Sequence, residues 1–448
     1  MPPKSRWPPK FLVMAVSELK VRRGIAMPLV VMNLTWFAKI VITTAFLGQL
    51  GELQLAGGML GFTFANITGF TVLNGQCGAK ELICGQAHGA WNFKLLHKTL
   101  FMSVLFLLAA SSPISFSWLN VDKVLIRFGQ QEDISLVAKS YLFYLLPDQV
   151  VTSFLCPLKT YLRSQGATIL IMFSSTLALA FHVPINILLA KAKGLEGILM
   201  AVRITDLMLV ILLALYVAIT EHGKDQNRKD VGWWEHGVHD WIQLLKLCGP
   251  CCLTTCLKWW CYEILVLLTR RLENTRWAVG VLAIGLNFDY LLYSAMLSLA
   301  TCASARVSNE LGANRPHISY RSAYVSLLVS VLPGCISAML IIWSATTGAS
   351  CLRGTAKPWL TLYSNLGGFY LLALPLGLVF AFKAGLGLEG LLLGFLFGVV
   401  SCLMLLLVFV ARIDWDEEAR KAQVFASSAQ EEQFDGAPPA ERENRMAA

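Results

Sequence analysis

Long apolar stretches alternate with short polar connections along most of the chain. Eleven such stretches recur between Met27 and Ala411. A helix of about 20 apolar residues is long enough to cross a bilayer. The pattern therefore predicts an all-α polytopic membrane protein, with spans at 27–47, 57–78, 99–118, 136–156, 169–190, 195–219, 242–268, 278–302, 320–344, 359–382 and 388–411.

Composition narrows the class further. Hydrophobic residues make up 56% of the 448 positions and charged residues 15%, whereas a soluble domain carries about 25% charged residues. This excludes a soluble enzyme with a single anchor, and also a disordered or collagen-like chain. The twelve cysteines lie mostly in apolar runs without paired CxxC motifs, so we expect packing residues and no metal site.

Basic residues in the connections predict the orientation. Up to residue 319, the N-terminal tail and every second connection after it hold 16 Lys and Arg residues, against 7 in the intervening connections. Because cytosolic connections are enriched in Lys and Arg, the N-terminus is predicted to be cytosolic. The net charge of +9 is interpreted in this way and not as a nucleic-acid signal. The predicted layout is a cytosolic segment 1–26, an N-lobe 27–220 of six spans, a cytosolic linker 221–241, a C-lobe 242–411 of about five spans, and a disordered acidic tail 412–448.

The chain also contains an internal repeat. Its matched landmarks, in the same order, are Pro28 and Pro250, Gly89 and Gly312, Leu162 and Leu352, Pro184 and Pro375, and the GLEG segments at 194–197 and 387–390. Such repeats indicate two six-helix lobes related by a pseudo-two-fold axis along the membrane normal. One interval differs, because Gly89 and Leu162 are 73 residues apart but Gly312 and Leu352 only 40. The second lobe is therefore predicted to be one helix short.

Ionisable residues inside spans are costly and mark candidate functional sites. Glu263 in the seventh span and Asp289 in the eighth are candidates for the carboxyl that binds and releases a coupled proton. The alternative for both is a carboxyl bonded to a neighbouring hydroxyl or amide. The candidates for lining a substrate cavity are Trp259, Lys258, Lys39, Asn287, Asp148 and His182.

The local sequence explains why three of these residues are cavity candidates. Trp259 lies one helical turn from Glu263 and could stack on an organic cation or simply pack. Asp148 directly follows a proline, and His182 lies two residues before one. Prolines break helices, and broken helices often line transport sites. Arg203 and Asp206 are three residues apart and are expected to neutralise each other.

Several mechanisms are not supported by any motif. The sequence has no G-x-x-x-x-G-K-[ST] loop, so ATP hydrolysis is not expected to drive it. It has no Arg-rich voltage-sensing helix and no repeated filter loop, which argues against a channel. Hydrolase and metalloprotease motifs are absent too, so no enzyme is expected.

Three segments resemble a known family. They are ICGQAHGA at 83–90, LKWWCYEILVLL at 257–268 and ASARVSNELGANRP at 303–316. They are similar to the signature segments of multidrug and toxic compound extrusion (MATE) transporters, in the form of the plant detoxification proteins. The positions that carry the resemblance include Gly85, Gln86, Gly89, Arg306, Asn309 and Gly312.

This resemblance implies two facing lobes, with substrate bound between or within them and exchanged against protons or sodium. Glu263 matches a coupling glutamate of the plant members, whereas Lys258 stands where the family often has a second glutamate. The acidic coupling residue of the tenth family helix is missing with the shortened segment. The resemblance implies no cofactor besides the coupling ion.

The sequence therefore predicts a proton-coupled antiporter that exports or sequesters organic compounds, such as xenobiotics, secondary metabolites, hormones or organic acids. We expect a monomer in the vacuolar, endosomal or plasma membrane, with the lipid bilayer and a small organic substrate as its partners. Neither nucleic acid nor ATP is an expected partner. The alternative is a non-transporting, truncated isoform that acts through association with other membrane proteins.

Overall fold

The computed structural model describes residues 9–222, 238–269, 294, 296–331 and 358–424. In these ranges every regular element is a helix. The first half contains α1 (Pro9–Gln49), α2 (Glu52–Ala65), the π-helix η1 (Asn66–Phe70), α3 (Thr71–Gly89), α4 (Phe93–Leu119), α5 (Val121–Arg127), α6 (Glu132–Ser164), α7 (Thr168–Lys193) and α8 (Leu195–His222).

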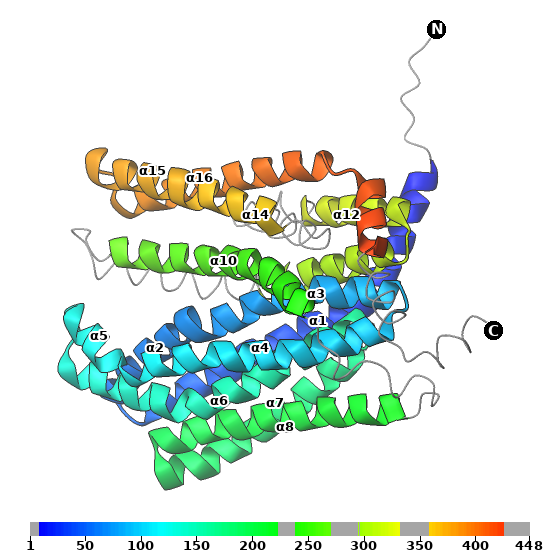
Figure 1. The fold of residues 1–448 in the computed structure, drawn as a ribbon. Coiled ribbons are helices and arrows are strands. Elements are labelled where there is room, and N and C mark those ends of the chain that lie inside the picture. Colours follow the sequence, from blue (N-terminus) through cyan, green and yellow to red (C-terminus); the bar gives the residue numbers. More distant parts are fainter. Residues whose placement is uncertain (1–8, 223–237, 270–293, 295, 332–357, 425–448) are drawn as a thin grey trace.

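The second half repeats this pattern of long helices. It contains α10 (Val238–Thr269), helical residues 296–312, α12 (Pro316–Val331), α14 (Pro358–Asn365), the π-helix η3 (Leu366–Ala373), α15 (Leu374–Leu378), the π-helix η4 (Val379–Lys383), α16 (Gly387–Ala411) and helical residues 415–424. Figure 1 shows the two halves as two stacked groups of roughly parallel helices, with α3 and α10 between them.

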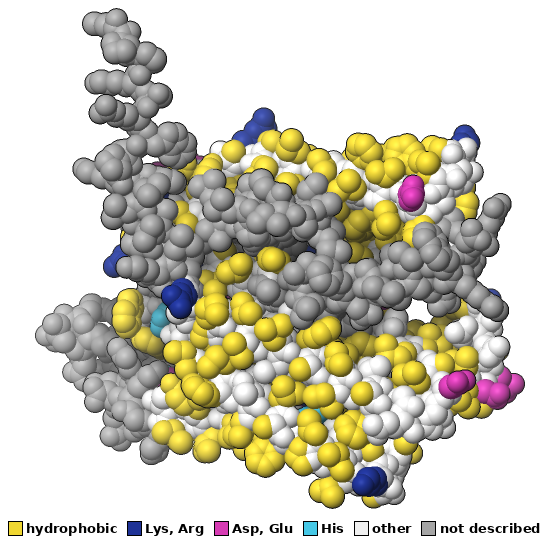
Figure 2. All heavy atoms as spheres, turned by 180° about the vertical axis from the view of Figure 1, so that it is seen from behind, with side chains coloured by type: hydrophobic (Ala, Val, Ile, Leu, Met, Phe, Trp, Pro, Cys, Tyr) yellow, Lys and Arg dark blue, Asp and Glu magenta, His cyan; other side chains and the backbone are white. Residues whose placement is uncertain are grey.

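Seven helical stretches in the described ranges are long and apolar enough to cross a membrane. They are Arg23–Gln49, Glu52–Gly89, Phe93–Leu119, Thr168–Lys193, Leu195–Glu221, Pro358–Lys383 and Gly387–Ala411. In the described part of the flank seen in Figure 2, hydrophobic side chains are widespread and charged ones are few, as lipid contact requires. The prediction of an all-α polytopic membrane protein is confirmed.

Some predicted boundaries change. Helix α1 begins at Pro9, so much of the segment 1–26 continues the first helix. The tail predicted to be disordered from residue 412 contains a helix at 415–424. Trp415 and Ala419 of this helix are buried in the same hydrophobic cluster as Leu311, which corrects the prediction for this part of the tail. The predicted span 278–302 lies mostly outside the described residues.

The helix ends define two faces of the bundle. We call the face where α3 ends at Gly89 the N-terminal face, because α1 also begins there (Figure 1). The opposite face carries the turns at Gly51, Gly129 and Gly194, all with positive φ. At the N-terminal face, the two lobes have the same backbone turn. Trp91 (φ 58°) and Asn314 (φ 55°) each lie two residues after a matched glycine.

Equivalent hydrogen bonds close these two turns. The amide of Asn92 donates to the carbonyl of Ala87, and that of Arg315 to the carbonyl of Glu310, both at 2.9 Å. Gly194 (φ 59°) and Gly387 (φ 55°) also match, each at the start of the last helix of its lobe. The sequence repeat is therefore a repeat of the backbone as well.

Contacts within the second half establish its helix directions. Helix α10 runs antiparallel to η1 and α3, since Cys248 contacts Gln76 and Trp260 contacts Ile67. Helix α10 therefore starts at the N-terminal face. Helix α14 and its continuation run parallel to α10, since Asn365 donates to the carbonyl of Thr254 at 3.1 Å and the hydroxyl of Tyr370 to that of Leu257 at 2.9 Å.

Helices α12 and α14 thus both begin at the N-terminal face. A single crossing over 320–344, as the apolar pattern predicts, does not give this arrangement, and part of that range lies outside the described residues. Helix α16 returns antiparallel to η3 and α15, with Gly368 against Cys402 and Gly377 against Gly394. The chain then places Trp415 against Tyr320, with their ring centroids 5.9 Å apart. Residues 415–424 therefore lie at the N-terminal face.

Candidate functional site

Polar side chains from three helices meet inside the N-lobe. Lys39 lies on α1, His182 on α7, and Thr205 and Asp206 on α8. These helices pack against one another. His182 is fully buried and Asp148, from the adjoining α6, is 3% exposed. The cluster is therefore an ionisable site in a largely dry environment, where electrostatic interactions are strong.

Lys39 and Asp206 form the ion pair of this cluster. The Nζ atom of Lys39 lies 2.6 Å from Oδ2 of Asp206 and donates to the carbonyl of Val202 at 3.2 Å. The two side chains are 14% and 21% exposed, so the pair is shielded from most solvent. We expected Asp206 to pair with Arg203 on the same helix. It pairs with Lys39 instead, because α1 packs against α8 and brings this cation closer.

Asp148 and Asp206 are a pair of neighbouring carboxyls. Their charges are close enough to interact, and Lys39 and Arg203 add positive charge nearby. Two neighbouring carboxylates repel each other, so a cation beside them stabilises the cluster. Lys39 contacts Asp206 directly, so Asp148 is the more weakly compensated of the two carboxyls. Among described residues, Oδ1 of Asp148 has no hydrogen-bond partner.

His182 connects three helices through its ring nitrogens. Its Nε2 lies 3.2 Å from the hydroxyl of Thr43 and 3.0 Å from Nδ2 of Asn186, and its Nδ1 lies 3.3 Å from the hydroxyl of Thr205. The amide orientation of Asn186 is fixed, because its Nδ2 also donates to the carbonyl of His182 at 2.9 Å. Nε2 must then accept from Asn186, so the proton is on Nδ1 and the ring is neutral.

Sequence reasoning found part of this cluster. It singled out Lys39, Asp148 and His182, which the structure brings into one region. It did not find Thr43, Asn186 and Thr205, and it treated Asp206 as structural. Asn186 could have been found from its spacing of four residues from His182, which places the two on one helix face. The prolines beside Asp148 and His182 do not break α6 or α7, which stay α-helical through them.

The C-lobe candidates lie apart from this cluster. Glu263 is half-buried on α10, where Lys258 is five residues before it. Trp259 contacts the ring of Tyr262, with the centroids 6.2 Å apart, and Tyr262 contacts Phe395 of α16 at 5.1 Å. Trp259 is therefore next to aromatic packing between α10 and α16. The candidates Asp289 and Asn287 lie outside the described residues.

The family-motif residues meet where the lobes touch at the N-terminal face. A Cβ atom added at Gly85 would overlap with Ser308, and one added at Gly89 would overlap with the carbonyl of Asn309. A Cβ at Gly312 would overlap with the backbone of Gln86. The three glycines thus allow backbone contact between the lobes, and we call this contact the glycine seam.

Polar bonds support the glycine seam. Nδ2 of Asn309 donates to the carbonyl of Ser164 at 3.0 Å, which fastens the C-lobe to the end of α6. Arg306 pairs with Glu310 on its own helix, with Nη2 and Oε1 3.6 Å apart. The motif residues therefore hold the lobes together at this face.

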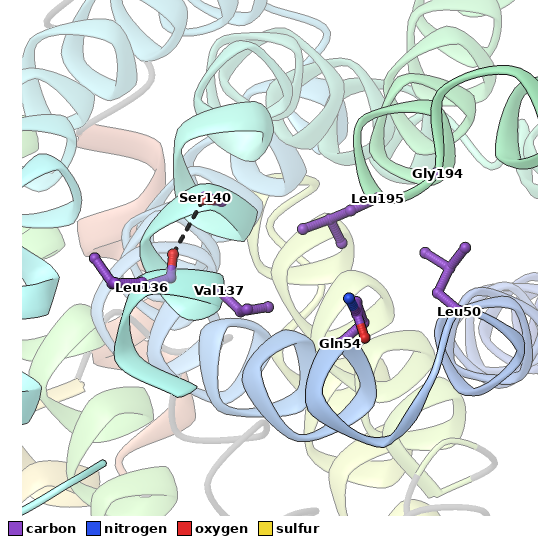
Figure 3. Close-up of a pocket in the computed structure, with 7 residues that line it drawn as sticks. All are labelled: Leu50, Gln54, Leu136, Val137, Ser140, Gly194 and Leu195. Atoms are coloured by element: carbon purple, nitrogen blue, oxygen red, sulfur yellow. Dashed lines mark hydrogen bonds between the residues drawn. The ribbon is translucent and has the colours of Figure 1, made fainter. Parts of the chain in front are cut away.

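A separate cavity of about 330 Å³ opens at the opposite face of the N-lobe. Figure 3 shows its lining, which comes from the ends of α1 and α7 and the starts of α2, α6 and α8. Leu136, Val137, Leu50 and Leu195 make it largely apolar, and the hydroxyl of Ser140 is bonded to the carbonyl of Leu136 at 3.0 Å. The cavity contains no residue of the polar cluster.

Two repeated lobes of membrane helices, touching across glycines at one face, define the class of secondary membrane transporters. Comparison with known proteins agrees. The MatE family model matches residues 28–188 and 250–386, and the chain belongs to this family of transporters, whose members are not enzymes. The two matched ranges correspond to the two repeats.

Relatives in Arabidopsis thaliana cover nearly the whole chain. Protein DETOXIFICATION 56 is 54% identical, over 93% of this chain and 92% of its own length. Protein DETOXIFICATION 48 is 36% identical, over 94% of this chain and 85% of its own length. The alignment with the first runs over 453 positions, more than the 448 residues of this chain, although it covers only 93% of them. That relative therefore has residues for which this chain has no counterpart.

Solved structures share the fold. The eukaryotic MATE transporter AtDTX14 aligns with a TM-score of 0.84 and 24% identity, over 92% of this chain and 99% of its own. The Vibrio cholerae MATE transporter VcmN, in its bent form, aligns with a TM-score of 0.74 and 16% identity, over 92% of this chain and 99% of its own. The two-lobe fold predicted from the internal repeat is that of MATE transporters.

Proposed function

We propose that the protein is a proton-coupled antiporter of small organic compounds and that Asp148 of the N-lobe cluster binds the coupled proton. The observation that carries this proposal is the burial of Asp148 close to the ion pair of Lys39 and Asp206. A carrier needs a group that binds a proton on one side of the membrane and releases it on the other. A carboxyl held next to a second carboxyl meets this need, because its proton leaves at the cost of repulsion between two charges.

The neutral ring of His182 supports assigning the proton to the carboxyls. Since Asn186 donates to Nε2, a second proton on the ring would face a donor and lose that bond. His182 therefore acts as a positioning residue, which holds α1, α7 and α8 together around the ion pair. Lys39 compensates the remaining charge when Asp148 is protonated.

Loss of the proton from Asp148 gives the cluster a second negative charge. Lys39 then has two carboxylates to neutralise, and an incoming organic cation or a shift of α1 against α8 relieves the excess. This links the proton to substrate and to helix position, which is what exchange requires. Glu263 of α10 remains a second candidate for a proton-linked carboxyl, in the other lobe.

The test is transport by purified protein in proteoliposomes, with a panel of fluorescent organic cations and anions and an imposed pH gradient. We expect uptake or efflux that falls when an ionophore collapses the gradient. Asp148→Asn should abolish proton-driven transport while the protein stays folded, and Asp122→Asn, on the surface helix α5, is the control. An equal rate of transport with and without the pH gradient would refute proton coupling.

The variant Glu263→Gln shows, in the same assay, which of the two lobes binds the coupled proton. If Asp148 binds the coupled proton, Asp148→Asn removes the response to the gradient and Glu263→Gln leaves part of it. Loss of the response in Glu263→Gln alone, with Asp148→Asn active, would move the proton site to the C-lobe. Full activity of Glu263→Gln would remove that residue from the mechanism.

A second candidate function rests on the residues that the relative has and this chain lacks. The shortening of the C-lobe that the sequence repeat predicts supports a non-transporting isoform that acts by association with other membrane proteins. Sequencing of transcripts across Ser344 and Ala345 tests it. A skipped coding segment about one helix long at that junction favours this candidate, and transport by the purified chain excludes it.

A further inference from the structure

Helix α10 brings two thiols into contact on one of its faces. Cys252 and Cys256 are four residues apart, a spacing that places side chains one above the other along a helix. Their Sγ atoms lie 3.8 Å apart, in direct contact. The pair is thus preorganised to bind one atom with both sulfurs.

The pair lies where the two lobes touch. Sγ of Cys252 is 3.7 Å from the carbonyl of Val72 on α3. A Cβ atom added at Gly75 would lie 2.9 Å from Cα of Cys252, so the two helix backbones are in close contact here. Cys252 is half-buried and Cys256 is buried, so Cys252 is the more exposed residue of the pair. A compound that reaches Cys252 is therefore in position to engage Cys256 next.

We propose that Cys252 and Cys256 form a chelating site for trivalent arsenicals. Thiolates select soft centres, and trivalent arsenic forms stable bonds to two sulfurs at once. Structural zinc instead takes four ligands, and the described residues include no group of three or more His, Cys, Asp and Glu placed for a metal. Two sulfurs in contact supply the two bonds that trivalent arsenic forms here, whereas they are too few for structural zinc.

The reaction with an organoarsenic oxide is a condensation without oxidation or reduction. Phenylarsine oxide, with one arsenic–oxygen double bond, reacts with the two thiols. Two arsenic–sulfur bonds form and the arsenic–oxygen bond breaks. Both thiol protons leave on that oxygen as one water molecule. Arsenic stays trivalent throughout, and the product is a ring closed by one turn of α10.

Intact mass spectrometry of the purified full-length chain tests the proposal. The protein is mixed with phenylarsine oxide in the presence of excess glutathione, which competes as a monothiol. We expect one retained phenylarsenic group, released by the dithiol 2,3-dimercaptopropanol. Cys252→Ser and Cys256→Ser should each bind about 100-fold more weakly, because each loses the intramolecular second bond.

Cys248→Ser is the matched control. Cys248 lies four residues before Cys252 on the same helix, but its Sγ is directed at the carbonyl of Gln76, 3.6 Å away. This variant should retain the arsenic as the wild type does. Retention by both Cys252→Ser and Cys256→Ser, or loss in Cys248→Ser, would overturn the assignment.

A measurement on the wild type makes the test independent of the folding of any variant. The arsenic-loaded protein is denatured in the presence of iodoacetamide, so that every thiol not bound to arsenic is alkylated. Peptide mapping should find Cys252 and Cys256 protected and the other thiols modified. Protection of a different pair of cysteines would refute the site.

Discussion

The side-chain amide of Asn33 donates a hydrogen bond to the hydroxyl of Ser298, with Nδ2 and Oγ 2.8 Å apart, and joins the two lobes inside the membrane. The same nitrogen lies 3.2 Å from the carbonyl of Ser294. Both acceptors belong to the C-lobe, whereas Asn33 lies on α1. When the lobes rock against each other, as alternating access requires, these bonds must break.

Asn33→Leu should loosen the contact between the lobes. A hydrogen bond contributes about 0.5–1.5 kcal/mol, so loss of two bonds should lower the free energy of unfolding by about 1–3 kcal/mol. Thermal unfolding in detergent measures this. Thr35→Val is the control, because the hydroxyl of Thr35 donates to the carbonyl of Met32 on the same helix. Equal stability of the two variants would contradict a role for Asn33 between the lobes.

Gly89→Val should hold the glycine seam open. The added side chain would overlap with the carbonyl of Asn309, so the lobes must separate at the N-terminal face. A cysteine introduced at Ser308, which is fully buried, should then react with a polar maleimide. Gly249→Ala is the control, because nothing lies within 4 Å of its added Cβ. Unchanged labelling in Gly89→Val would show that the seam does not depend on close approach.

Lys39→Met should destabilise the N-lobe, because it leaves the carboxylate of Asp206 without its direct cation. Breaking one partner of a buried ion pair costs about 3–5 kcal/mol. The double variant Lys39→Met with Asp206→Leu should recover most of this, because the uncompensated charge is gone. A double-mutant cycle of unfolding free energies measures the coupling. Simple additivity of the two changes would mean that the pair contributes nothing.

His182→Leu should cost more stability than His182→Gln. Leucine removes the ring from Asn186 and from the hydroxyls of Thr43 and Thr205, which keep only their bonds to backbone carbonyls. Each lost hydrogen bond costs about 0.5–1.5 kcal/mol. Glutamine keeps an amide donor and acceptor of similar reach. Melting temperatures of the two variants against the wild type provide the comparison. A lower melting temperature for His182→Gln would argue against hydrogen bonding as the role of His182.

The two ends of the chain should be accessible from the same compartment. Residues 415–424 pack at the face where α1 begins, with Trp415 against Tyr320. Protease-cleavable tags before Met1 and after Ala448 should therefore be cut from the same side of intact vesicles. A tag placed in the turn at Gly129 should be protected in that orientation. Cleavage of the two terminal tags from opposite sides would contradict the arrangement.

Apolar length and the internal repeat predicted most of the fold. Runs of about 20 apolar residues specify spans, because backbone groups in lipid must bond within their own helix. The landmarks Gly89 and Gly312 predicted the repeat, and the structure adds that each precedes the same backbone turn. It was harder to predict how often the chain crosses the membrane between α12 and α14. The single apolar run at 320–344 gives no sign that these two helices begin at the same face.

The candidate site was predicted residue by residue but not as a group. Sequence spacing relates side chains on one helix, so it paired Asp206 with Arg203. The contact with Lys39 depends on how α1 packs against α8, and 163 residues separate Lys39 from Val202, its other partner. Which helix faces meet depends on packing of whole lobes, and no local pattern encodes it.

Substitutions in the glycine seam can change the contact between the lobes in one direction only. Gly85, Gly89 and Gly312 already have the smallest side chain that the genetic code offers, so every substitution there adds atoms to a contact without room for them. Random change can therefore weaken the closure of this face but cannot strengthen it by shortening the distance between the lobes. Any tighter closure would have to arise at neighbouring positions such as Asn309, where a side chain can still gain a bond.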